Sequence, residues 1–466
     1  MTMEVLADWV SRISNVVWNG LLLYLLVGTG IVFTIRTRFI QVRKFGAGWK
    51  HLFGHFSLNG EKAGKDGMSP FQALTTAIAA QVGTGNIAGA ATALYSGGPG
   101  AIFWMWLSAF FGMSTIYGEA VLAQKYKTTD DKGHVTGGPI YYIRARFQGG
   151  FGKFLAGFFS VAIIFALGFT GNMVQANSIS VAFKTAFGAP QIVVGVVCAI
   201  IAAFIFLGGV GRIASVTEKV VPIMALFYMG GAVIVLWVHR AALPQAFAQI
   251  CSMAFDTRAG TGGVLGYGMT QAVRAGVSRG IFSNEAGLGS SVMVHAAADA
   301  REPCEQGMWA VFEVFFDTIV MCSVTAFVIL TSGVYDVSRY ALASGTPLIS
   351  QLTTGAQLTA EAFSTVFGRF GGGFVAVSLA LFAFSTLLGW SYYGQRAAAY
   401  LMGERVIPVY KAAFLLAAVA GCMMRLEPVW ALSDTFNGLM ALPNLAGVLA
   451  LRRQVIAEWC RYKHDL

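Results

Sequence analysis

The sequence predicts an all-α, polytopic membrane protein, and its composition is the first reason. Of the 466 residues, 56% are apolar and only 12% are charged, whereas about 25% of the residues of a soluble protein are charged. The mean hydropathy is +0.65. A chain this apolar lacks the polar surface that a soluble enzyme, a disordered scaffold or a secreted disulfide domain needs. We therefore expect a lipid bilayer around it.

The length of the apolar segments is the second reason. Crossing about 30 Å of hydrocarbon takes about 20 mainly apolar residues. Eleven segments qualify: 15–35, 70–94, 99–123, 151–178, 190–208, 218–238, 263–298, 306–332, 371–400, 408–424 and 431–451. Short glycine turns or longer polar loops separate them, notably 36–67, 124–150 and 333–367. We expect one integral membrane domain over residues 1–466.

The distribution of basic residues predicts the orientation. If the N-terminus lies outside, 23 Lys and Arg residues fall on the inner side and 7 on the outer side, with Arg274 and Arg279 inside the seventh segment. This asymmetry follows the positive-inside rule, so we expect the N-terminus outside and the C-terminus inside. The net charge of +10 then reflects topology, and no nucleic-acid partner is expected.

Two segments carry polar, glycine-rich interruptions. Gln81-Val82-Gly83-Thr84-Gly85-Asn86 interrupts the second segment, and Ser283-Asn284-Glu285-Ala286-Gly287 interrupts the seventh. A glycine costs about 1 kcal/mol inside a helix, so both strings predict local unwinding. Unpaired backbone in a bilayer persists only where protein or a water-filled cavity satisfies it.

The positions of the interruptions predict an internal repeat. The segment 15–35 stands alone, whereas 70–238 and 263–452 each hold five helices and each begin with a broken one. Because five is odd, the second set must have inverted topology. Matched interruptions in two halves indicate the midplane site of a transporter. The alternative is that the glycines are packing notches, but two matched breaks favour a site.

The ends of the broken helix predict the substrate. A half-helix that begins at Gly85–Ile87 directs free N–H groups and a positive dipole end at the cavity, which suits a carboxylate. The half-helix that ends near Ala79–Val82 leaves carbonyls that suit Na⁺ or an ammonium group. A compact zwitterion satisfies both ends, so we expect an amino acid.

Several strings resemble one family, the alanine or glycine:cation symporters. They are QVGTGNIAG (81–89), GGPIYYI (137–143), TEKVVPIMA (217–225), RGIFSNEAGLGS (279–290) and FFDTIVMCSVTAFVIL (315–330). The resemblance runs from about residue 15 to residue 452. It implies a leucine-transporter-like fold with one added N-terminal helix. It also implies symport of alanine or glycine with Na⁺, or occasionally H⁺, across the cytoplasmic (inner) membrane of a prokaryote.

A more distant resemblance, to the unwound first helix of the leucine-transporter fold, implies a Na⁺ site. By position, its ligands are the carbonyls of Ala79 and Val82 and the side chains of Ser385 and Thr386. The alternative is that both hydroxyls bond to their own helix. No cofactor is expected beyond Na⁺ as the coupling ion.

The predicted substrate-binding residues lie at the two breaks and on two further helices. They are Gln81, Gly83, Thr84, Gly85, Asn86, Gln175, Asn284 and Trp390. Gln175 is favoured over Asn172 and Asn177, although all three could form interhelical hydrogen bonds instead. Trp390 would wall the pocket and limit side-chain size; the alternative is ordinary packing.

Two intramembrane carboxylates stand four residues apart, hence on one helix face. Glu313 and Asp317 could bind an ion or a proton, since such residues indicate function by default. The favoured hypothesis is a structural pairing with Arg274 or Arg279, the two cations in the preceding helix.

Other classes of function fit less well. The string Gly276-Val277-Ser278-Arg279-Gly280 matches the GxSxG pattern, but that motif needs a strand–turn–helix, so no enzymatic activity is expected. A channel would need a repeated filter, and we find no such motif. The sequence leaves open alanine, glycine, serine or glutamine as substrate, the stereoisomer, Na⁺ or H⁺ coupling, the stoichiometry and the oligomeric state.

Overall fold

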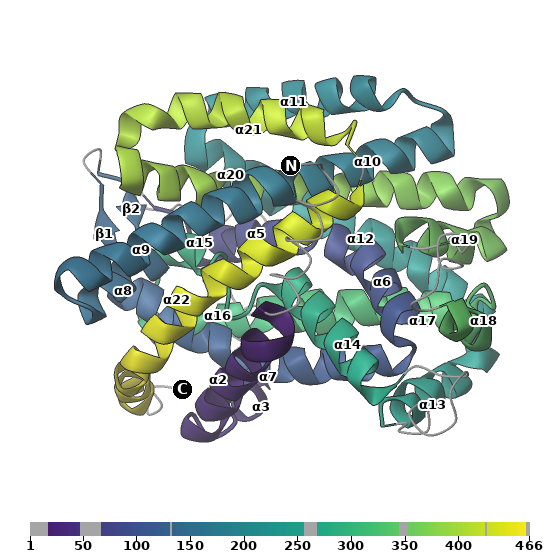
Figure 1. Cartoon of the computed structure of the whole chain (residues 1–466), viewed down its shortest axis with the longest axis horizontal. Helices are drawn as coiled ribbons and strands as arrows, with labels where there is room; N and C mark the ends of the chain where they lie inside the picture. The colour runs from purple at the N-terminus through teal and green to yellow at the C-terminus, as the bar shows by residue number, and fades with distance from the viewer. Residues whose placement is uncertain are drawn as a thin grey trace.

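The computed structural model describes residues 17–46, 67–130, 133–255, 268–343, 353, 355–424 and 426–462. Helices make up nearly all of these residues (Figure 1). The one sheet in the described ranges is an antiparallel pair, β1 (Thr128–Thr129) and β2 (Val135–Thr136). The predicted all-α class is confirmed.

The helices follow one another with few long connections. Three π-helical segments continue neighbouring α-helices, and a fourth follows the first break. The helical elements are η1 (Val17–Leu22), α2 (Leu23–Arg36), α3 (Ile40–Arg43), α5 (Pro70–Gln81), η2 (Gly85–Gly89), α6 (Ala90–Gly97), α7 (Gly100–Lys125), α8 (Pro139–Arg146), α9 (Gly149–Ile163), η3 (Ile164–Gly171), α10 (Asn172–Phe187), α11 (Gln191–Leu207), α12 (Gly209–Val238), η4 (Arg240–Ala242), α13 (Leu243–Met253), α14 (Met269–Asn284), α15 (Val292–Ala296), α16 (Pro303–Val314), η6 (Phe315–Cys322), α17 (Ser323–Thr331), α18 (Val337–Ala343), α19 (Gly355–Phe367), η8 (Gly368–Phe370), α20 (Gly371–Met402), η9 (Glu404–Val406), α21 (Ile407–Gly421) and α22 (Leu426–Tyr462).

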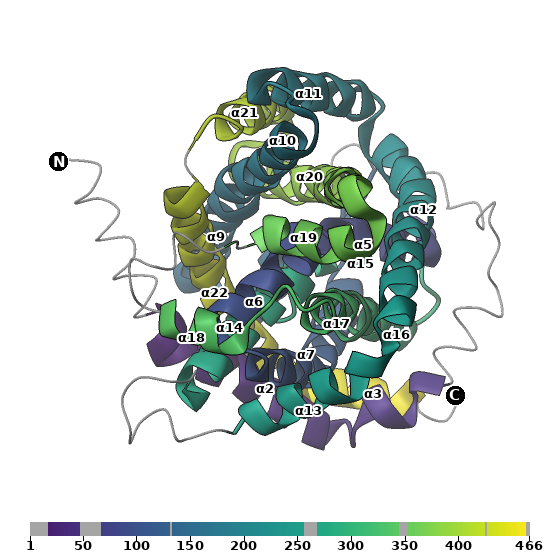
Figure 2. The same cartoon turned by 90° about the vertical axis from the view of Figure 1, so that its right-hand side faces the viewer.

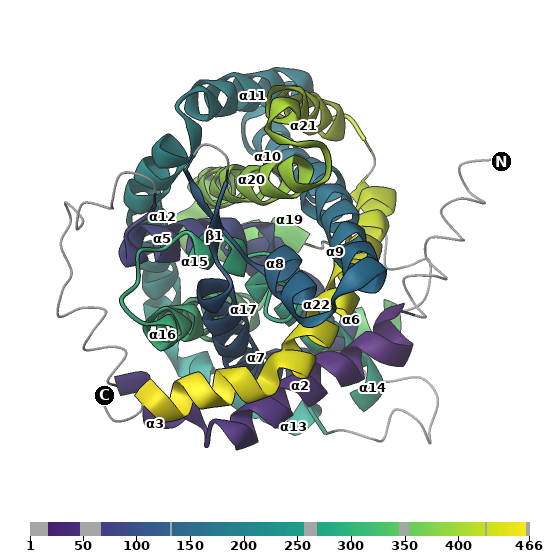
Figure 3. The same ribbon diagram turned by 90° about the vertical axis from the view of Figure 1, so that its left-hand side faces the viewer.

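The broken helices lie in the middle of the molecule. In Figures 1, 2 and 3, α11 and α21 form one outer layer, and α2 and α7 lie on the opposite side. Between them, α5 packs against α15 and α20, and α14 packs against α6 and α7. Both interruptions are therefore surrounded by other helices, as unwound backbone in a bilayer requires.

Helix occupies each of the eleven predicted segments within the described residues, but the loops were predicted incompletely. The residues 15–16 and 263–267 of two segments lie outside the described residues. The regions predicted as polar loops also contain α3, α8, α18 and α19, and α13 lies in the connection after residue 238. The 13-residue α19 is too short to register as a span, yet it buries Leu358, Ala362 and Phe363 against its neighbours.

Five helical stretches of the described residues are long and apolar enough to cross a membrane: Gly100–Lys125, Gly149–Phe187, Gly209–Val238, Pro303–Thr331 and Gly355–Met402. The broken helices cannot meet a length criterion, because α5 and α14 stop after 12 and 16 residues. The count of eleven spans and the inverted repeat therefore stay predictions.

The surface is apolar where helices face outward. On α11, Ile200, Phe204 and Leu207 are 64%, 66% and 84% exposed. Large patches of exposed apolar side chains are rare on soluble monomers, whereas apolar side chains are favourable against the lipid tails of a bilayer. The chain is a multi-pass membrane protein.

The string that matched GxSxG has a packing role. Gly276 lies where α14 crosses α7, and a Cβ at this position would lie 2.2 Å from the carbonyl oxygen of Ala101. Small residues let helix backbones approach closely in membranes. The glycine is therefore explained by the crossing.

Candidate functional site

The first interruption is built from Gly83. Helix α5 begins with a capping box between Ser69 and Gln72 and ends at Gln81, after which Val82 has a ψ of 88°. A Cβ on Gly83 would lie 2.4 Å from Thr386 Oγ1, so a side chain here would push into α20. The predicted unwinding is confirmed, and glycine is required by close approach.

The N–H groups freed by this break find side-chain acceptors. Gly83 N donates to Asn86 Oδ1 at 2.9 Å, and Thr84 N donates to Gln175 Oε1 at 3.2 Å. Asn86 Nδ2 in turn donates to Asp317 Oδ1 at 2.7 Å. Gln175, from α10, therefore reaches the break, and Asn86 supports it with both ends of its amide.

The carbonyl end of the break faces two hydroxyls of α20. Ala79 O accepts from Ser385 Oγ at 3.2 Å and from Thr386 Oγ1 at 3.1 Å, and Val82 O lies 3.4 Å from Thr386 Oγ1. All four residues are at most 1% exposed. The structure thus brings together the four residues predicted as Na⁺ ligands. Both hydroxyls also lie within hydrogen-bond distance of Phe382 O in their own helix. The predicted alternative, hydrogen bonding within α20, is therefore also present.

The chemistry of this donor set fits a hard cation. It consists of two carbonyl and two hydroxyl oxygens with no nitrogen or sulfur among the four ligands, and hard cations prefer oxygen ligands. The ligands are neutral, so a cation would bring its own charge into a buried place. A monovalent ion costs less to desolvate there than a divalent one.

Two buried polar atoms at the break lack a hydrogen-bond partner among the described residues. They are Thr84 Oγ1 and Gln81 Oε1, on side chains that are 0% and 3% exposed. A buried polar atom without a partner costs about 1–3 kcal/mol. Such atoms beside unwound backbone are what a polar ligand would satisfy. Gly85 lies next to Ser283 across the break, where a Cβ would meet its side chain at 3.1 Å.

The second interruption spans the residues between α14 and α15. Glu285 has a φ of +55°, and Gly287 and Gly289 also have positive φ. Asn284 Oδ1 accepts from Ala286 N at 3.0 Å, and Asn284 Nδ2 donates to Thr318 Oγ1 at 3.0 Å. The predicted break is confirmed. Asn284, which we predicted to bind substrate, has both ends of its amide engaged in holding the break.

Trp390 connects α20 to this second break. Its Nε1 donates to Glu285 Oε1 at 2.6 Å, and the side chain is 2% exposed. Its ring lies against Gly171, where a Cβ would approach to 2.6 Å. The indole is thus fixed in position between the second break and the π-helical segment η3.

The structure corrects the hypothesis on the intramembrane carboxylates. Arg279 binds Asp434 at 2.5 Å, so its predicted pairing with Glu313 or Asp317 is wrong. Glu313 instead contacts His295 at 2.6 Å. Asp317 accepts from Asn86, from Ser283 at 3.0 Å and from Thr318 at 2.8 Å. Both carboxylates therefore connect the two breaks: Asp317 bonds to Asn86 of the first and Ser283 of the second. Glu313 bonds to Gln81 of the first and to His295 of α15, which follows the second.

Further residues that were not predicted as site residues hold the breaks; Glu119 was expected to form a local salt bridge or a gate. Glu119 Oε2 accepts from Gly287 N at 3.1 Å, and Asn444 Nδ2 donates to Gly287 O at 2.8 Å and to Glu119. His295 is 0% exposed. The signal was present, since Glu119, His295 and Asn444 are polar residues inside predicted spans, where such residues indicate function by default.

Two cavities lie at opposite ends of the first broken helix. One, of about 520 Å³, touches Ala88, Thr92 and Tyr95 at its C-terminal half and also Arg279. The other, of about 400 Å³, touches Met68 and Gln72 at its start and also Ala297 and Arg396. The break therefore stands between them. This is the arrangement that alternating access around a fixed site needs.

The sequence is similar to a family of sodium-dependent symporters. Residues 3–466 match the sodium:alanine symporter family. The chain is 43% identical to a sodium/alanine symporter of Methanococcus maripaludis, covering 97% of this chain and 96% of that protein. It is 38% identical to a probable sodium/glutamine symporter of Bacillus subtilis, covering 97% and 90%.

A likeness to a solved structure concerns the fold. A Na⁺-coupled sialic acid symporter superposes with a TM-score of 0.53 at 15% identity, covering 93% of this chain and 86% of that one. Low identity with an extensive superposition indicates a shared arrangement of helices.

Proposed function

The chain belongs to the sodium:alanine symporter family, and from that premise we propose that it imports alanine or glycine together with Na⁺ by alternating access. The observation that carries the proposal is the convergence of four oxygens at the first break, from Ala79, Val82, Ser385 and Thr386. One of these oxygens comes from α5, one from Val82 directly after it, and two from α20. A Na⁺ ion bound there would hold the two helices together.

The substrate binds beside the ion, at the break itself. Its carboxylate accepts from Thr84 Oγ1 and from the positive end of the half-helix that follows. Its ammonium group is held by the carbonyl end of the break and by Gln81 Oε1. The two buried atoms without partners, Thr84 Oγ1 and Gln81 Oε1, support this assignment because a zwitterion supplies what each one lacks.

The size of the substrate is limited by the side chains around the break. Gln175 of α10 bonds to Thr84 at the first break, Trp390 of α20 bonds to Glu285 at the second, and both side chains are almost completely buried. A small side chain such as that of alanine fits this setting better than a long one. Glutamine is the second candidate, because a relative with 38% identity is named as a probable sodium/glutamine symporter.

The architecture that we propose is the leucine-transporter-like one. Residues 70–238 and 263–452 form two inverted five-helix repeats after an extra N-terminal helix at 15–35. The protein lies in the cytoplasmic membrane of a prokaryote with the N-terminus outside. Na⁺ is the coupling ion and no further cofactor is needed; coupling to H⁺ is the alternative.

Equilibrium binding tests the proposal. Labelled alanine is added to purified protein in NaCl or in KCl at equal ionic strength, and unlabelled glycine, glutamine and D-alanine compete. Binding in NaCl alone, displaced by glycine, is the expected result. Displacement by glutamine at a lower concentration than by glycine would replace alanine with the second candidate. Equal binding in both salts would contradict a role for Na⁺.

A further inference from the structure

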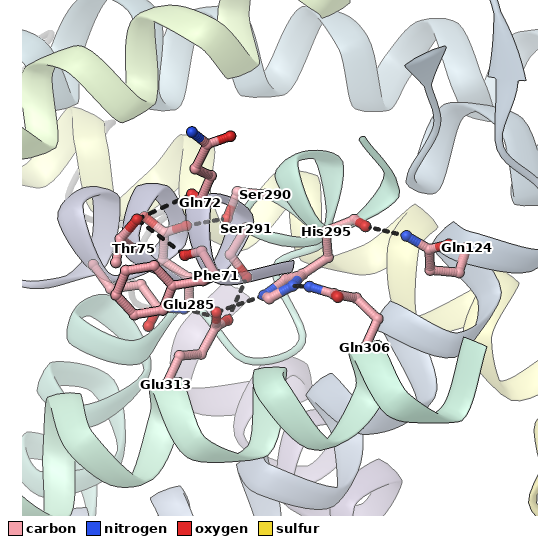
Figure 4. A network of polar contacts seen from close by, with 11 residues as sticks. Phe71, Gln72, Thr75, Gln124, Glu285, Ser290, Ser291, His295, Gln306 and Glu313 are labelled. Atoms are coloured by element: carbon pink, nitrogen blue, oxygen red, sulfur yellow. Dashed lines mark hydrogen bonds and ion pairs between the residues drawn. The ribbon is translucent and has the colours of Figure 1, made fainter. Parts of the chain in front are cut away.

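A chain of buried polar side chains runs from the first break to the end of α7. Gln81 Nε2 donates to Glu313 Oε1 at 2.9 Å, and Glu313 Oε2 lies 2.6 Å from His295 Nε2. His295 Nδ1 lies 2.6 Å from Gln306 Nε2, and Gln124 Nε2 donates to His295 O at 2.5 Å. Figure 4 shows Glu313 and Gln306 facing His295. All five side chains are buried.

Glu313 and His295, at the centre of this series of side chains, can exist in two states that differ by one proton. When Gln306 Nε2 donates to His295 Nδ1, the imidazole is neutral and its Nε2–H points at the carboxylate. When the amide of Gln306 turns over, its oxygen accepts from a protonated Nδ1 and the imidazole is cationic. Gln306 Oε1 has no hydrogen-bond partner among the described residues, so it is available for the second state. No other side chain has to move.

Several titratable groups surround Glu313. Its neighbours are Glu119 of α7, Glu285 of the second break, Asp317 on its own helical segment, Tyr393 of α20 and His295 of α15. Of these groups, only His295 can carry a positive charge. An ionised carboxylate at membrane depth is costly without a partner, and His295 is the partner that Glu313 contacts, at 2.6 Å.

We propose that the Glu313–His295 pair is a proton-binding site whose proton is released when Na⁺ binds at the first break. The inference rests on the proposed function, because it needs that Na⁺ site. Gln81 makes the connection: it bonds to Glu313 and directly precedes Val82, whose carbonyl is a proposed ligand. One positive charge leaves as another arrives, so the net charge of the buried region stays constant.

The coupling follows from electrostatics. Two positive charges in a region of low dielectric constant repel each other strongly, so each ion weakens the binding of the other by the same factor. The proton leaves to water. His295 lies two residues before Ala297, which lines the cavity of about 400 Å³, and we place the exit of the proton on this side.

The wild-type protein alone provides the first test. Purified protein in weakly buffered KCl without alanine receives NaCl, or choline chloride as the control, and a pH-sensitive dye reports free protons. We expect Na⁺ to release up to one proton per protein, whereas choline releases none. At acidic pH, the Na⁺ concentration for half-saturation should rise about tenfold for each unit by which the pH falls. This is the slope expected when one proton is exchanged for one Na⁺. Binding of ²²Na⁺ with no proton release and no pH dependence would overturn the inference and leave the symporter proposal intact.

A pair of matched variants assigns the proton to its site. Glu313→Gln keeps an acceptor for Gln81 and Ser291 but cannot exchange a proton, so proton release and the pH dependence of ²²Na⁺ binding should both disappear. Asp434→Asn alters another carboxylate, which is paired with Arg279, and should retain both. Release that persists in Glu313→Gln would overturn the assignment, and so would its loss in the Asp434→Asn control. Absence of ²²Na⁺ binding to the wild-type protein at every pH would instead contradict the symporter proposal itself.

Discussion

Replacing Thr386 by valine tests the Na⁺ site most sharply, because it removes one oxygen and almost no volume. The hydroxyl of Thr386 lies 3.1 Å from Ala79 O, 3.4 Å from Val82 O and 3.0 Å from Phe382 O. It has a single proton and can donate to one of these carbonyls at a time. In the absence of Na⁺, the variant therefore loses one neutral hydrogen bond, which is worth about 1 kcal/mol.

The loss should be larger when Na⁺ is bound. An interaction of a polar group with a charged one contributes about 1.5–3 kcal/mol, and about 1.4 kcal/mol corresponds to a factor of ten in affinity. Thr386→Val should therefore weaken Na⁺ binding by the difference between the two losses, about 0.5–2 kcal/mol, and raise the Na⁺ concentration for half-maximal alanine binding by roughly 2- to 30-fold. The thermal unfolding temperature measured in KCl should change little.

The assay is alanine binding at a series of NaCl concentrations with the ionic strength kept constant by KCl. Thr386→Ser is the matched control, since it keeps the hydroxyl and loses a methyl group. We expect its half-maximal Na⁺ concentration to stay within a few-fold of wild type. If the valine and serine variants depend on Na⁺ in the same way, the oxygen of Thr386 is no ligand and the reasoning fails.

Three further substitutions test other parts of the structure. Thr84→Ala removes a buried hydroxyl that has no partner among the described residues. The affinity for alanine should fall about tenfold or more, whereas ²²Na⁺ binding should be kept. Equal loss of both would contradict a direct role of Thr84 in holding the substrate. Gly83→Ala places a methyl group 2.4 Å from Thr386 Oγ1, so ²²Na⁺ binding should be largely lost; wild-type binding would show that the break is looser than described. Gly276→Ala places its Cβ 2.2 Å from Ala101 O, and overpacking of this kind costs about 1–3 kcal/mol. The unfolding temperature should therefore be lower in both NaCl and KCl. An unchanged unfolding temperature would refute the close crossing of α14 and α7.

The sequence predicted well what local composition determines. The string from Gln81 to Asn86 contains two glycines and three polar side chains in an apolar segment, and the structure unwinds there. The second interruption was predicted by the same signal. The residues proposed as Na⁺ ligands, some 300 positions apart, came from a resemblance, because no local pattern could show that α20 packs on α5.

The errors concern contacts between distant segments. Arg279 was expected near Glu313 or Asp317 because it lies in the preceding helix, yet it faces Asp434 of α22. Proximity along the chain says nothing about which face of a helix a side chain occupies. The short helix α19 was missed for a different reason. Its stability comes from burial against α20 and η2, and tertiary packing of this kind leaves no long apolar run.

Uptake into sealed vesicles tests the central claim most directly. Labelled alanine is presented to proteoliposomes under an imposed inward Na⁺ gradient, with K⁺ and H⁺ gradients of equal size as controls. The account predicts concentrative uptake with Na⁺ alone, competed by glycine and reduced in Thr386→Val. Concentrative uptake driven by the H⁺ gradient without Na⁺, or alanine that only equilibrates across the membrane under every gradient, would contradict it.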